Sequence, residues 1–391
     1  MLINIIFLNL RNYLTILSTS KLHVLFLTSW YPSRVFPTLG DFIQRHAEAL
    51  HVIHKVSVIH VISDPNLENT IEFDTQEING INTYIAYIPT NISLFKKFIL
   101  QFKAYLFLIN KIGKFDLVHL NKLYPSGMIA LYLKFFKQKK YLITEHWSGY
   151  QTANNFSIGF FEKSISKIIT RNASFVCPVS KNLGLEMQNF GLKGNYLSIP
   201  NVVDTNLFQP IQTSNDNLQL IHISSMDDSI KNITGIINVL DEFNKENSNF
   251  ICYFIGGKKD KFTTQLAKLE LTENQIQFIE HIPQKDMVAY LQKADTFILF
   301  SNYENLPCVI LESFSCGVPV IATNVGGISE YFPENFGQLI SVNNEIELLN
   351  ALKNIKKPNI EQKNQMHQYA IDNFSRENIA HKFDHLYRQM L

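Results

Sequence analysis

Two glutamates eight positions apart, Glu304 and Glu312, are the residues whose type and spacing most clearly suggest chemistry. They stand in the run SNYENLPCVILESFSCGVPVIATNVGGISE, from Ser301 to Glu330. Read as a helix, their separation is about 12 Å along the axis, at about 1.5 Å per residue. A helix start between them would turn free backbone N–H groups and the positive end of the helix dipole toward an anion. This arrangement suits a nucleoside diphosphate sugar, with a carboxylate at each end and the phosphates between them.

The neighbouring elements would place both glutamates at one edge of a parallel sheet. The apolar run Phe297–Phe300 predicts a buried strand, and Pro307 fits the first turn of a helix over Cys308–Cys316. Val318–Thr323 predicts the next buried strand, and the loop Asn324–Gly327 after it has two consecutive glycines, which allow close backbone approach. Two loops at the carboxyl ends of adjacent strands would therefore converge on one crevice, where open α/β sheets bind ligands.

Each glutamate also has an ordinary structural interpretation. A glutamate before a helix, such as Glu304, is commonly a solvated charge that favours the helix dipole. Glu312 lies in CVILESFSC, a nearly apolar helix, where a carboxylate without a partner would be costly to bury. The pair taken together favours ligand binding.

The run resembles the E-x7-E motif of family 4 retaining glycosyltransferases, which have the GT-B fold. The G-x-P-V-I-A and G-G-x-x-E patterns that follow the motif in this family are present as well. Further matches cover most of the chain from about residue 22: YPS and GDF near Tyr31 and Asp41, EHW around His146, PVS at Pro178–Ser180, IPNVVD at Ile199–Asp204, KN at Lys231–Asn232 and FIGG at Phe254–Gly257. The combination is similar to group 1 enzymes of bacterial polysaccharide and lipopolysaccharide biosynthesis.

The resemblance implies roles for the residues on the donor side. Glu312 resembles the carboxylate that hydrogen-bonds the ribose hydroxyls, and Glu304 resembles the one that contacts the donor sugar. Lys231 resembles the phosphate-binding lysine, whose charge would offset that of the departing nucleoside diphosphate. The other residues expected at the donor are Asn305, Leu306, Cys308 and Val309, through backbone N–H groups, together with Ser225 and Gly256.

One position departs from the family pattern. The family commonly has G-R after the strand that begins at Leu218, whereas this chain has Ser224-Ser225. A serine hydroxyl does not replace a bidentate arginine contact with a diphosphate. Either another cation takes this part, or the diphosphate is held by Lys231 and backbone dipoles.

The acceptor side has fewer matches. His146 matches the family's active-site histidine, and a sugar contact is favoured over the alternative of a histidine held in the core. Gly40 resembles the family's glycine near the acceptor and the phosphate. Tyr31 is expected on the same acceptor-side loop, with Trp30 and Arg34.

Composition sets the class of protein and of partner. The chain has 391 residues, 46% hydrophobic and 18% charged, with a net charge of +1, so no large polycationic surface favours nucleic acid. The four cysteines have no C-x-x-C spacing, which favours reduced core thiols. No His/Cys cluster has zinc spacing and Asp227-Asp228 is not a D-x-D motif, so we expect no metal or other cofactor besides the nucleotide sugar co-substrate.

Strand-like and helix-like runs alternate almost throughout, as in stacked β-α units around parallel sheets. We expect the α/β GT-B fold: two Rossmann-like doubly wound parallel-sheet domains facing a cleft, with a C-terminal helix crossing back to the first domain. The expected divisions are an N-terminal extension over 1–20, a first domain over 21–200, a linker over 201–210, a second domain over 211–372 and the returning helix over 373–391. Within them we expect a hairpin at Asn79-Gly80 and helices over Ile230–Phe243 and Phe262–Leu271.

Two segments raise the question of membrane contact. MLINIIFLNL at the start is too short for a membrane span, and a peripheral anchor is the alternative to a plain extension. Ser93–Lys114 and the KFFKQKK segment that ends at Lys140 combine aromatic residues with lysines, which fits either an anionic bilayer surface or a core-facing helix with snorkelling lysines. We expect a cytoplasmic protein associated with the inner face of the membrane.

These observations predict an enzyme that moves a sugar from a nucleoside diphosphate sugar to a hydroxyl of a saccharide or lipid-linked acceptor, with retention of configuration. Cell-surface polysaccharide or glycolipid synthesis is the expected setting. Two alternatives stay open. One is a GT-B nucleotide-sugar epimerase that needs no acceptor. The other is a non-catalytic sugar-nucleotide-binding homologue in a polysaccharide assembly complex, which the serine at position 225 would permit.

Overall fold

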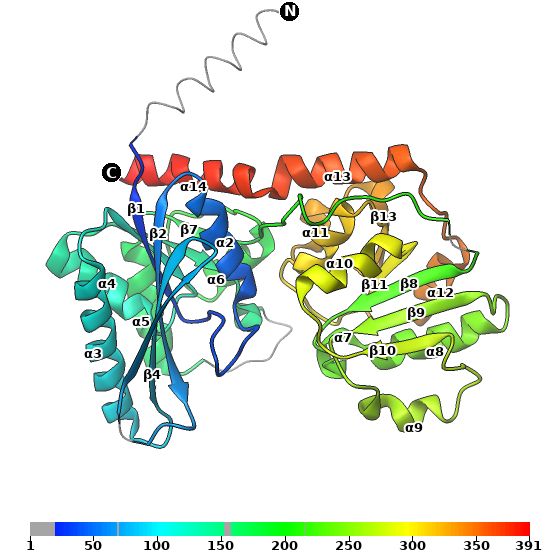
Figure 1. The fold of residues 1–391 in the computed structure, drawn as a ribbon, viewed down its shortest axis with the longest axis horizontal. Helices are drawn as coiled ribbons and strands as arrows, with labels where there is room; N and C mark the ends of the chain where they lie inside the picture. Colours follow the sequence, from blue (N-terminus) through cyan, green and yellow to red (C-terminus); the bar gives the residue numbers. More distant parts are fainter. Residues whose placement is uncertain (1–19, 69, 152–157, 215) are drawn as a thin grey trace, which may run out of the picture.

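The computed structural model describes residues 20–68, 70–151, 158–214 and 216–391. Two sheets, parallel except for one edge strand of the first, lie side by side, each with helices on its faces, and the last two helices run across both (Figure 1). Most strand residues are buried, as expected where helices cover both faces of a parallel sheet. The expectation for residues 1–20 falls almost entirely outside the described part of the chain.

The first sheet has seven strands in the order β3-β4-β2-β1-β5-β6-β7. β3 and β4 form the expected antiparallel hairpin, and Asn79 and Gly80 in its turn have φ of 51° and 79°, the left-handed conformation that such two-residue turns need. The strands are β1 His23–Thr28, β2 Lys55–Asp64, β3 Glu72–Ile78, β4 Ile81–Pro89, β5 Leu117–Asn121, β6 Tyr141–Glu145 and β7 Val176–Pro178. Its helices are α2 Asp41–His51, α3 Leu94–Ile112, α4 Gly127–Lys137, α5 Phe160–Asn172 and α6 Lys181–Asn189.

The second sheet has six strands in the order β10-β9-β8-β11-β12-β13, and its neighbouring strands pair in parallel. The strands are β8 Leu218–Ile223, β9 Phe250–Ile255, β10 Ile276–Ile279, β11 Thr296–Leu299, β12 Val320–Thr323 and β13 Gly337–Ile340. The helices around it are α7 Asp228–Lys231, α8 Ile233–Asn244, α9 Thr263–Leu266, α10 Gln284–Lys293, α11 Cys308–Ser315 and α12 Glu345–Lys353.

Two helices of the second sheet differ from the sequence prediction. The segment predicted as one helix from Ile230 is split at Asn232, which has φ 50° and caps α8 by accepting the Gly235 N–H. Lys231 therefore ends a one-turn helix and does not start a long one. The helix predicted over Phe262–Leu271 is shorter in the structure, where only α9 forms. Packing of a buried face stabilises a longer helix, and Phe262 is the one buried residue in this stretch.

The C-terminal segment crosses from the second sheet to the first, as predicted. Helix α13, Ile360–Phe374, packs on α11, and α14, Arg376–Met390, packs on α2 (Figure 1). The Ser375 hydroxyl accepts the Asn378 N–H and starts α14, and Arg376 pairs with Glu48 at 3.1 Å and Asp204 at 2.9 Å. The crossing ties the two halves together beside the cleft residues described next.

Candidate donor site between the two sheets

The loops that follow β11 and β12 meet, as their position at adjacent strand ends predicts. The Gly327 N–H donates to the Asn305 carbonyl at 2.8 Å. Gly326 has φ 58°, and a Cβ on it would lie 1.8 Å from the Glu304 carbonyl oxygen. Only glycine fits such an approach, so Gly326 fixes the backbone that carries Glu304.

The carboxylate of Glu304 is held by two groups of the second domain. Its Oε1 accepts a hydrogen bond from the Ser301 hydroxyl at 2.8 Å and forms an ion pair with the Lys231 ammonium. The side chains are 11% exposed for Glu304 and 16% for Lys231, so the pair is largely shielded from water. The turn at Asn232 brings Lys231 to the carboxylate, which joins the two residues expected at the donor sugar and its phosphate.

Glu312 is buried on the flank of α11 and faces the first domain. Its Oε1 accepts hydrogen bonds from Arg45 Nη1 of α2 at 2.6 Å and from Gln284 Nε2 of α10 at 2.8 Å. Arg45 Nη2 also donates to Asp41 at 2.7 Å. Burial raises the pKa of Glu312, and the positive charge of Arg45 acts against that rise.

Arg45 and Gln284 had no signal in the sequence. They come from two different helices, and neither forms a spaced motif with Glu312. Burial of a glutamate inside an apolar helix did require a partner for its charge, but only the fold shows that the partner comes from the other domain.

Several more hydrogen bonds join the loops of the two domains. Asn305 Nδ2 donates to the His146 carbonyl at 2.6 Å, and Gln151 Nε2 donates to Asn305 Oδ1 at 2.6 Å and also to the Glu304 carbonyl. Asn201 Nδ2 donates to the Leu306 carbonyl at 2.8 Å. The Glu304–Leu306 segment is therefore fixed from the first domain as well as from its own.

Glu330, at the end of the run from Ser301 to Glu330, also contacts the first domain. It accepts the backbone N–H groups of Lys181 and Asn182, both at 2.7 Å, at the start of α6. A carboxylate at a helix N-terminus is favoured by the dipole and by the free N–H groups there. Its role in the structure is to bridge the domains.

His146 lies beneath this contact region with its ring in the core of the first domain. The residue is 8% exposed, and its ring centroid is 4.6 Å from that of Phe42 and 5.3 Å from that of His46. Burial, with the nearby His46 and His119, holds the pKa of His146 well below its ordinary value, so the ring is neutral at pH 7. Phe383 of α14 packs on His46 and His119, so the returning helix supports the histidine from behind.

The expected diphosphate region lies at the start of α11. Pro307 precedes the first helical residue, Cys308, and Val309 follows it. Ser225 is exposed on the loop after β8. Gly256, with φ 111°, packs where a Cβ would be 2.1 Å from the Ser224 carbonyl, so it supports the backbone of that loop.

The residues predicted for the acceptor side differ in their burial. Gly40 starts α2 with φ 78°, and a Cβ there would lie 2.7 Å from the Trp30 carbonyl, so it holds the Trp30 loop against the helix. Tyr31 is fully buried in the core of the first domain, so its side chain supports the loop from inside. Trp30, beside it, is only partly buried.

The described residues also bear on metal binding and on membrane spanning. Within the described ranges no group of three or more His, Cys, Asp or Glu side chains is arranged to hold a metal ion. Among the helices of the same ranges, none is both long and apolar enough to cross a bilayer.

Solved structures share this fold across nearly the whole chain. Sucrose-phosphate synthase from Thermosynechococcus elongatus superposes with a TM-score of 0.72 at 20% identity, covering 94% of this chain and 99% of the other. Anabaena HepE in complex with UDP gives a TM-score of 0.69 at 16% identity, with coverage of 94% and 100%. At such identities the likeness concerns the GT-B fold alone.

The relatives found by sequence align over less of this chain than the solved structures do. The putative teichuronic acid biosynthesis glycosyltransferase TuaC of Bacillus subtilis (strain 168) is 28% identical over 239 residues, which are 61% of this chain and 60% of the Bacillus protein. An uncharacterized glycosyltransferase of Methanocaldococcus jannaschii is 24% identical over 325 residues, which are 80% of this chain and 83% of that one.

Family models match both halves of the chain. Residues 40–207 match the model described as Glycosyltransferase Family 4, and residues 204–373 match Glycosyl transferases group 1. The two matched segments overlap at residues 204–207 and together include the residues of the candidate donor site described above. The chain therefore belongs to the family 4, group 1 glycosyltransferases, a family of retaining enzymes.

Proposed function

We propose that this protein transfers a sugar from a nucleoside diphosphate sugar to an acceptor hydroxyl with retention of configuration. One observation carries the proposal: Glu304, paired with Lys231, and Glu312 stand on either side of the N-terminus of α11. Sugar hydroxyls, diphosphate and ribose hydroxyls follow one another in the same order along such a donor.

Donor binding would rearrange the Glu304–Lys231 pair. In the structure the carboxylate and the ammonium neutralise each other. A bound donor offers hydroxyls to Glu304 and phosphate oxygens to Lys231, so each charge exchanges one partner for another without being left unpaired. The N–H groups at the start of α11 add to the binding of the phosphates.

Arg45 is the cation that we assign to the ribose end of the site. It approaches Glu312 from the first domain, so ribose recognition and domain contact involve the same carboxylate. The charge of Arg45 lowers the pKa of Glu312 against the effect of burial and so favours the ionised form, which the carboxylate needs in order to accept hydrogen bonds from both ribose hydroxyls.

The transfer step needs one bond to break and one to form at the anomeric carbon. The C1–oxygen bond to the diphosphate breaks, and the acceptor oxygen bonds to C1 on the same face. The acceptor proton passes to a phosphate oxygen of the departing diphosphate. Lys231 and the α11 N-terminus stabilise the negative charge that develops on that leaving group.

His146 contributes through position and not through charge. Its carbonyl accepts from Asn305, the residue after Glu304, and its neutral ring lies on Phe42. A neutral imidazole can share a hydrogen bond with a sugar hydroxyl without a competing ionic partner. Loss of the ring should therefore disturb the sugar end of the donor more than the ribose end.

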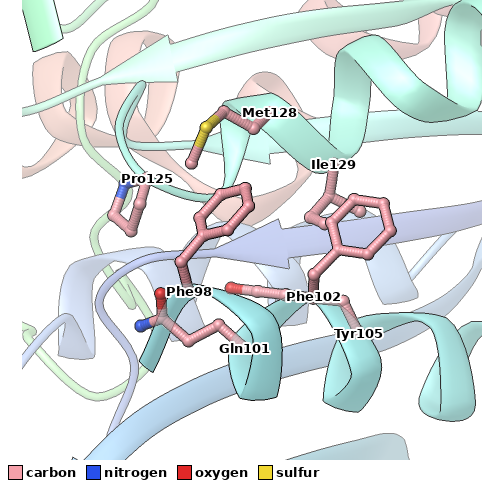
Figure 2. A pocket seen from close by; sticks show the side chains of 7 residues that line it. All are labelled: Phe98, Gln101, Phe102, Tyr105, Pro125, Met128 and Ile129. Atoms are coloured by element: carbon pink, nitrogen blue, oxygen red, sulfur yellow. The ribbon is translucent and has the colours of Figure 1, made fainter. Parts of the chain in front are cut away.

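The surface formed by α3 and α4 has features that favour membrane contact, and membrane contact would suit a lipid-linked acceptor. Ring contacts join Phe98 to Phe102, Phe102 to Tyr132, and Tyr132 to Phe136, with centroids 6.4, 5.5 and 5.2 Å apart. Figure 2 shows the rings of Phe98 and Phe102 on α3 directed toward Met128 and Ile129 of α4. The exposed large apolar side chains on these two helices are Leu94, Phe95, Phe98, Phe107, Phe135 and Phe136.

The charge of this surface complements an anionic bilayer. Neither α3 nor α4 contains an acidic residue, and together they carry the lysines Lys96, Lys97, Lys103, Lys111, Lys134 and Lys137. Exposed aromatic rings with lysines around them are typical of helices that lie on a membrane surface. We place the protein at the inner face of the membrane, where a lipid-linked saccharide of cell-surface polysaccharide synthesis would be its acceptor.

Vesicle binding tests the membrane part separately. The purified chain should bind anionic vesicles at low salt and dissociate as salt rises, and Lys96→Glu with Lys97→Glu should weaken that binding. Lys268→Glu, an exposed position beyond the second sheet, is the matched control. Equal binding by both variants would remove the α3–α4 surface from the proposal.

Incubation with a panel of nucleotide sugars tests the function itself. A transferase releases nucleoside diphosphate and glycosylates a saccharide or lipid-linked acceptor with retained configuration. An epimerase would isomerise the donor without any acceptor, and a binding homologue would bind nucleotide and release none. The proposal predicts the first result, and either of the other two would replace it.

A further inference from the structure

Both tryptophans of the chain lie beside one lysine, Lys122. The Lys122 ammonium is 4.4 Å from the ring centroid of Trp30 and 5.0 Å from that of Trp147. Trp30 follows β1, Lys122 directly follows β5, and Trp147 follows β6, and these three strands are neighbours in the order β1-β5-β6. The cluster therefore lies at the carboxyl edge of the first sheet, where open α/β sheets bind ligands.

A buried carboxylate fixes the geometry of this cluster. Glu145 is fully buried, and it accepts the backbone N–H groups of Leu123 at 2.9 Å, His146 at 2.9 Å and Trp147 at 3.0 Å. It thereby ties the residue after Lys122 to the loop that carries Trp147. Gly149 admits the indole, because a Cβ there would lie 2.2 Å from the Trp147 ring.

The indole faces hold the charge of Lys122 in place without neutralising it. Burial lowers the pKa of Lys122, while Glu145 and Glu162 act to raise it. The oxygens of Glu145 are used by backbone N–H groups, and the ion pairs found among the described residues do not include Lys122. A cation held by ring faces keeps its N–H groups available for an anion.

The cluster is next to the donor site. Trp147 follows His146, whose carbonyl binds Asn305 across the cleft, and Gln151, a few residues on, binds the Glu304 carbonyl. The same loop thus contacts the sugar end of the donor site and carries one of the two indoles. An acceptor has to present its hydroxyl at that end.

We propose that Lys122, Trp30 and Trp147 form an acceptor subsite for a negatively charged saccharide. The ammonium pairs with a phosphate or carboxylate on the acceptor, and the apolar face of a pyranose ring lies against an indole. This assignment rests on the proposed transferase function, because it takes the donor sugar to be at Glu304. It adds the chemical class of the acceptor to that function.

Tryptophan fluorescence reports on this subsite alone, because the chain has no tryptophan besides Trp30 and Trp147. Glucose 6-phosphate, glucuronate and glucose would be titrated into the full chain at constant ionic strength. We expect a saturable change in emission with at least one of the two anionic sugars and a response to glucose at least ten-fold weaker. Lys122→Met should weaken the anionic response at least ten-fold, whereas Lys268→Met, at an exposed control position, should leave it unchanged.

The arms of the experiment separate the possible sources of the signal. A response to the phosphate sugar alone assigns a phosphorylated acceptor, and a response to glucuronate alone assigns an acidic sugar. Persistence in Lys231→Ala shows that the anion is not in the donor site. Titrations unchanged by Lys122→Met, no response to either anion, or loss in Lys231→Ala would each overturn the subsite.

A parallel assay of nucleoside diphosphate release keeps the two proposals apart. A saturable, Lys122-dependent response without release from any donor would count against the transferase and leave the anion site standing. Release with no Lys122-dependent response would count against the subsite alone.

Discussion

The proposed donor site and the proposed acceptor subsite are assembled from the sequence in different ways. On the donor side, Glu304, Glu312 and the Gly326 turn come from one run of thirty residues around a single helix. On the acceptor side, Trp30, Lys122 and Trp147 each follow a different strand. A site built from consecutive residues can be recognised as a motif, whereas one built from separate strand ends exists only once the sheet has formed.

The largest expected effect is on the donor side, at the Glu304–Lys231 pair. Lys231→Met or Glu304→Gln should lower turnover about 100-fold or more, because charge stabilisation at the leaving group is lost. Circular dichroism and thermal unfolding should show that the fold persists. Lys353→Met, which removes a more exposed ion pair with Glu246, is the matched control and should keep its rate. Near-normal turnover in both site variants would remove the proposed donor site.

The next effect tests the contribution of the first domain to donor binding. Arg45→Gln should raise the donor KM about ten-fold, the cost of losing one charge-assisted hydrogen bond. Burial already raises the pKa of Glu312, so removing the arginine should raise it further. The charge left beside Glu312 is then that of Asp41 on α2, which also raises the pKa of Glu312. The nearby thiols of Cys308 and Cys316 are neutral, because burial raises the pKa of each.

The charge of Glu312 determines the direction in which donor affinity should change with pH in Arg45→Gln. In the proposed site Glu312 binds the ribose as an anion, so donor affinity should be lost as the pH falls through the pKa of Glu312, and this loss should begin at higher pH in Arg45→Gln. Arg45→Lys should move the profile back toward that of the native chain. A lower donor KM in Arg45→Gln would contradict this account, because it would show that Arg45 competes with the ribose.

Gly326→Ala tests how much the donor loop depends on close backbone approach. The substitution should cost about 1–3 kcal/mol from the left-handed backbone conformation, and more from the contact with the Glu304 carbonyl, which would lie 1.8 Å from the new Cβ. Gly113→Ala is the control, since Gly113 has φ 78° but nothing within 4 Å of the new atom. Thermal unfolding should show a larger loss for Gly326→Ala. Equal losses would mean that strain alone matters.

Mild acid should destabilise the first sheet more than the second. Burial lowers the pKa of His23, His46, His54, His60, His119 and His146 around the first sheet, and of His222 in the second. Below pH 6.5 the unfolded chain binds protons that the folded chain does not, so the free energy of unfolding decreases as the pH is lowered. The slope is about 1.4 kcal/mol per pH unit for each additional proton bound.

Hydrogen exchange at pH 7 and pH 5.5 checks this expectation. Amide protection in β1, β2 and β5 should decrease more than protection in β8 and β11. Burial raises the pKa of Glu145 in the first half and of Glu312 in the second, so protonation of these carboxyls opposes the loss of stability in both halves. An equal loss in both sheets, or a larger loss in the second, would contradict the assignment.

The sequence predicted the fold and the donor loops because both depend on local patterns. Alternating apolar runs indicate parallel sheets, and Asn79-Gly80 carries its own turn geometry. The break at Asn232 was missed, since a single residue in a left-handed conformation interrupts an otherwise continuous helical pattern. Arg45, Gln284 and Lys122 were missed because their partners lie on other elements, and the burial of Tyr31 depends on the packing around it.

Calorimetric titration of a nucleoside diphosphate and of its sugar-bearing form tests the two-ended donor site most directly. The account predicts that Glu312→Ala weakens both ligands by the same factor, because both contain ribose. Glu304→Ala should weaken only the sugar-bearing form. A Glu304→Ala variant that loses both ligands equally, or a Glu312→Ala variant that binds both as the native chain does, would contradict the assignment of sugar and ribose to the two glutamates.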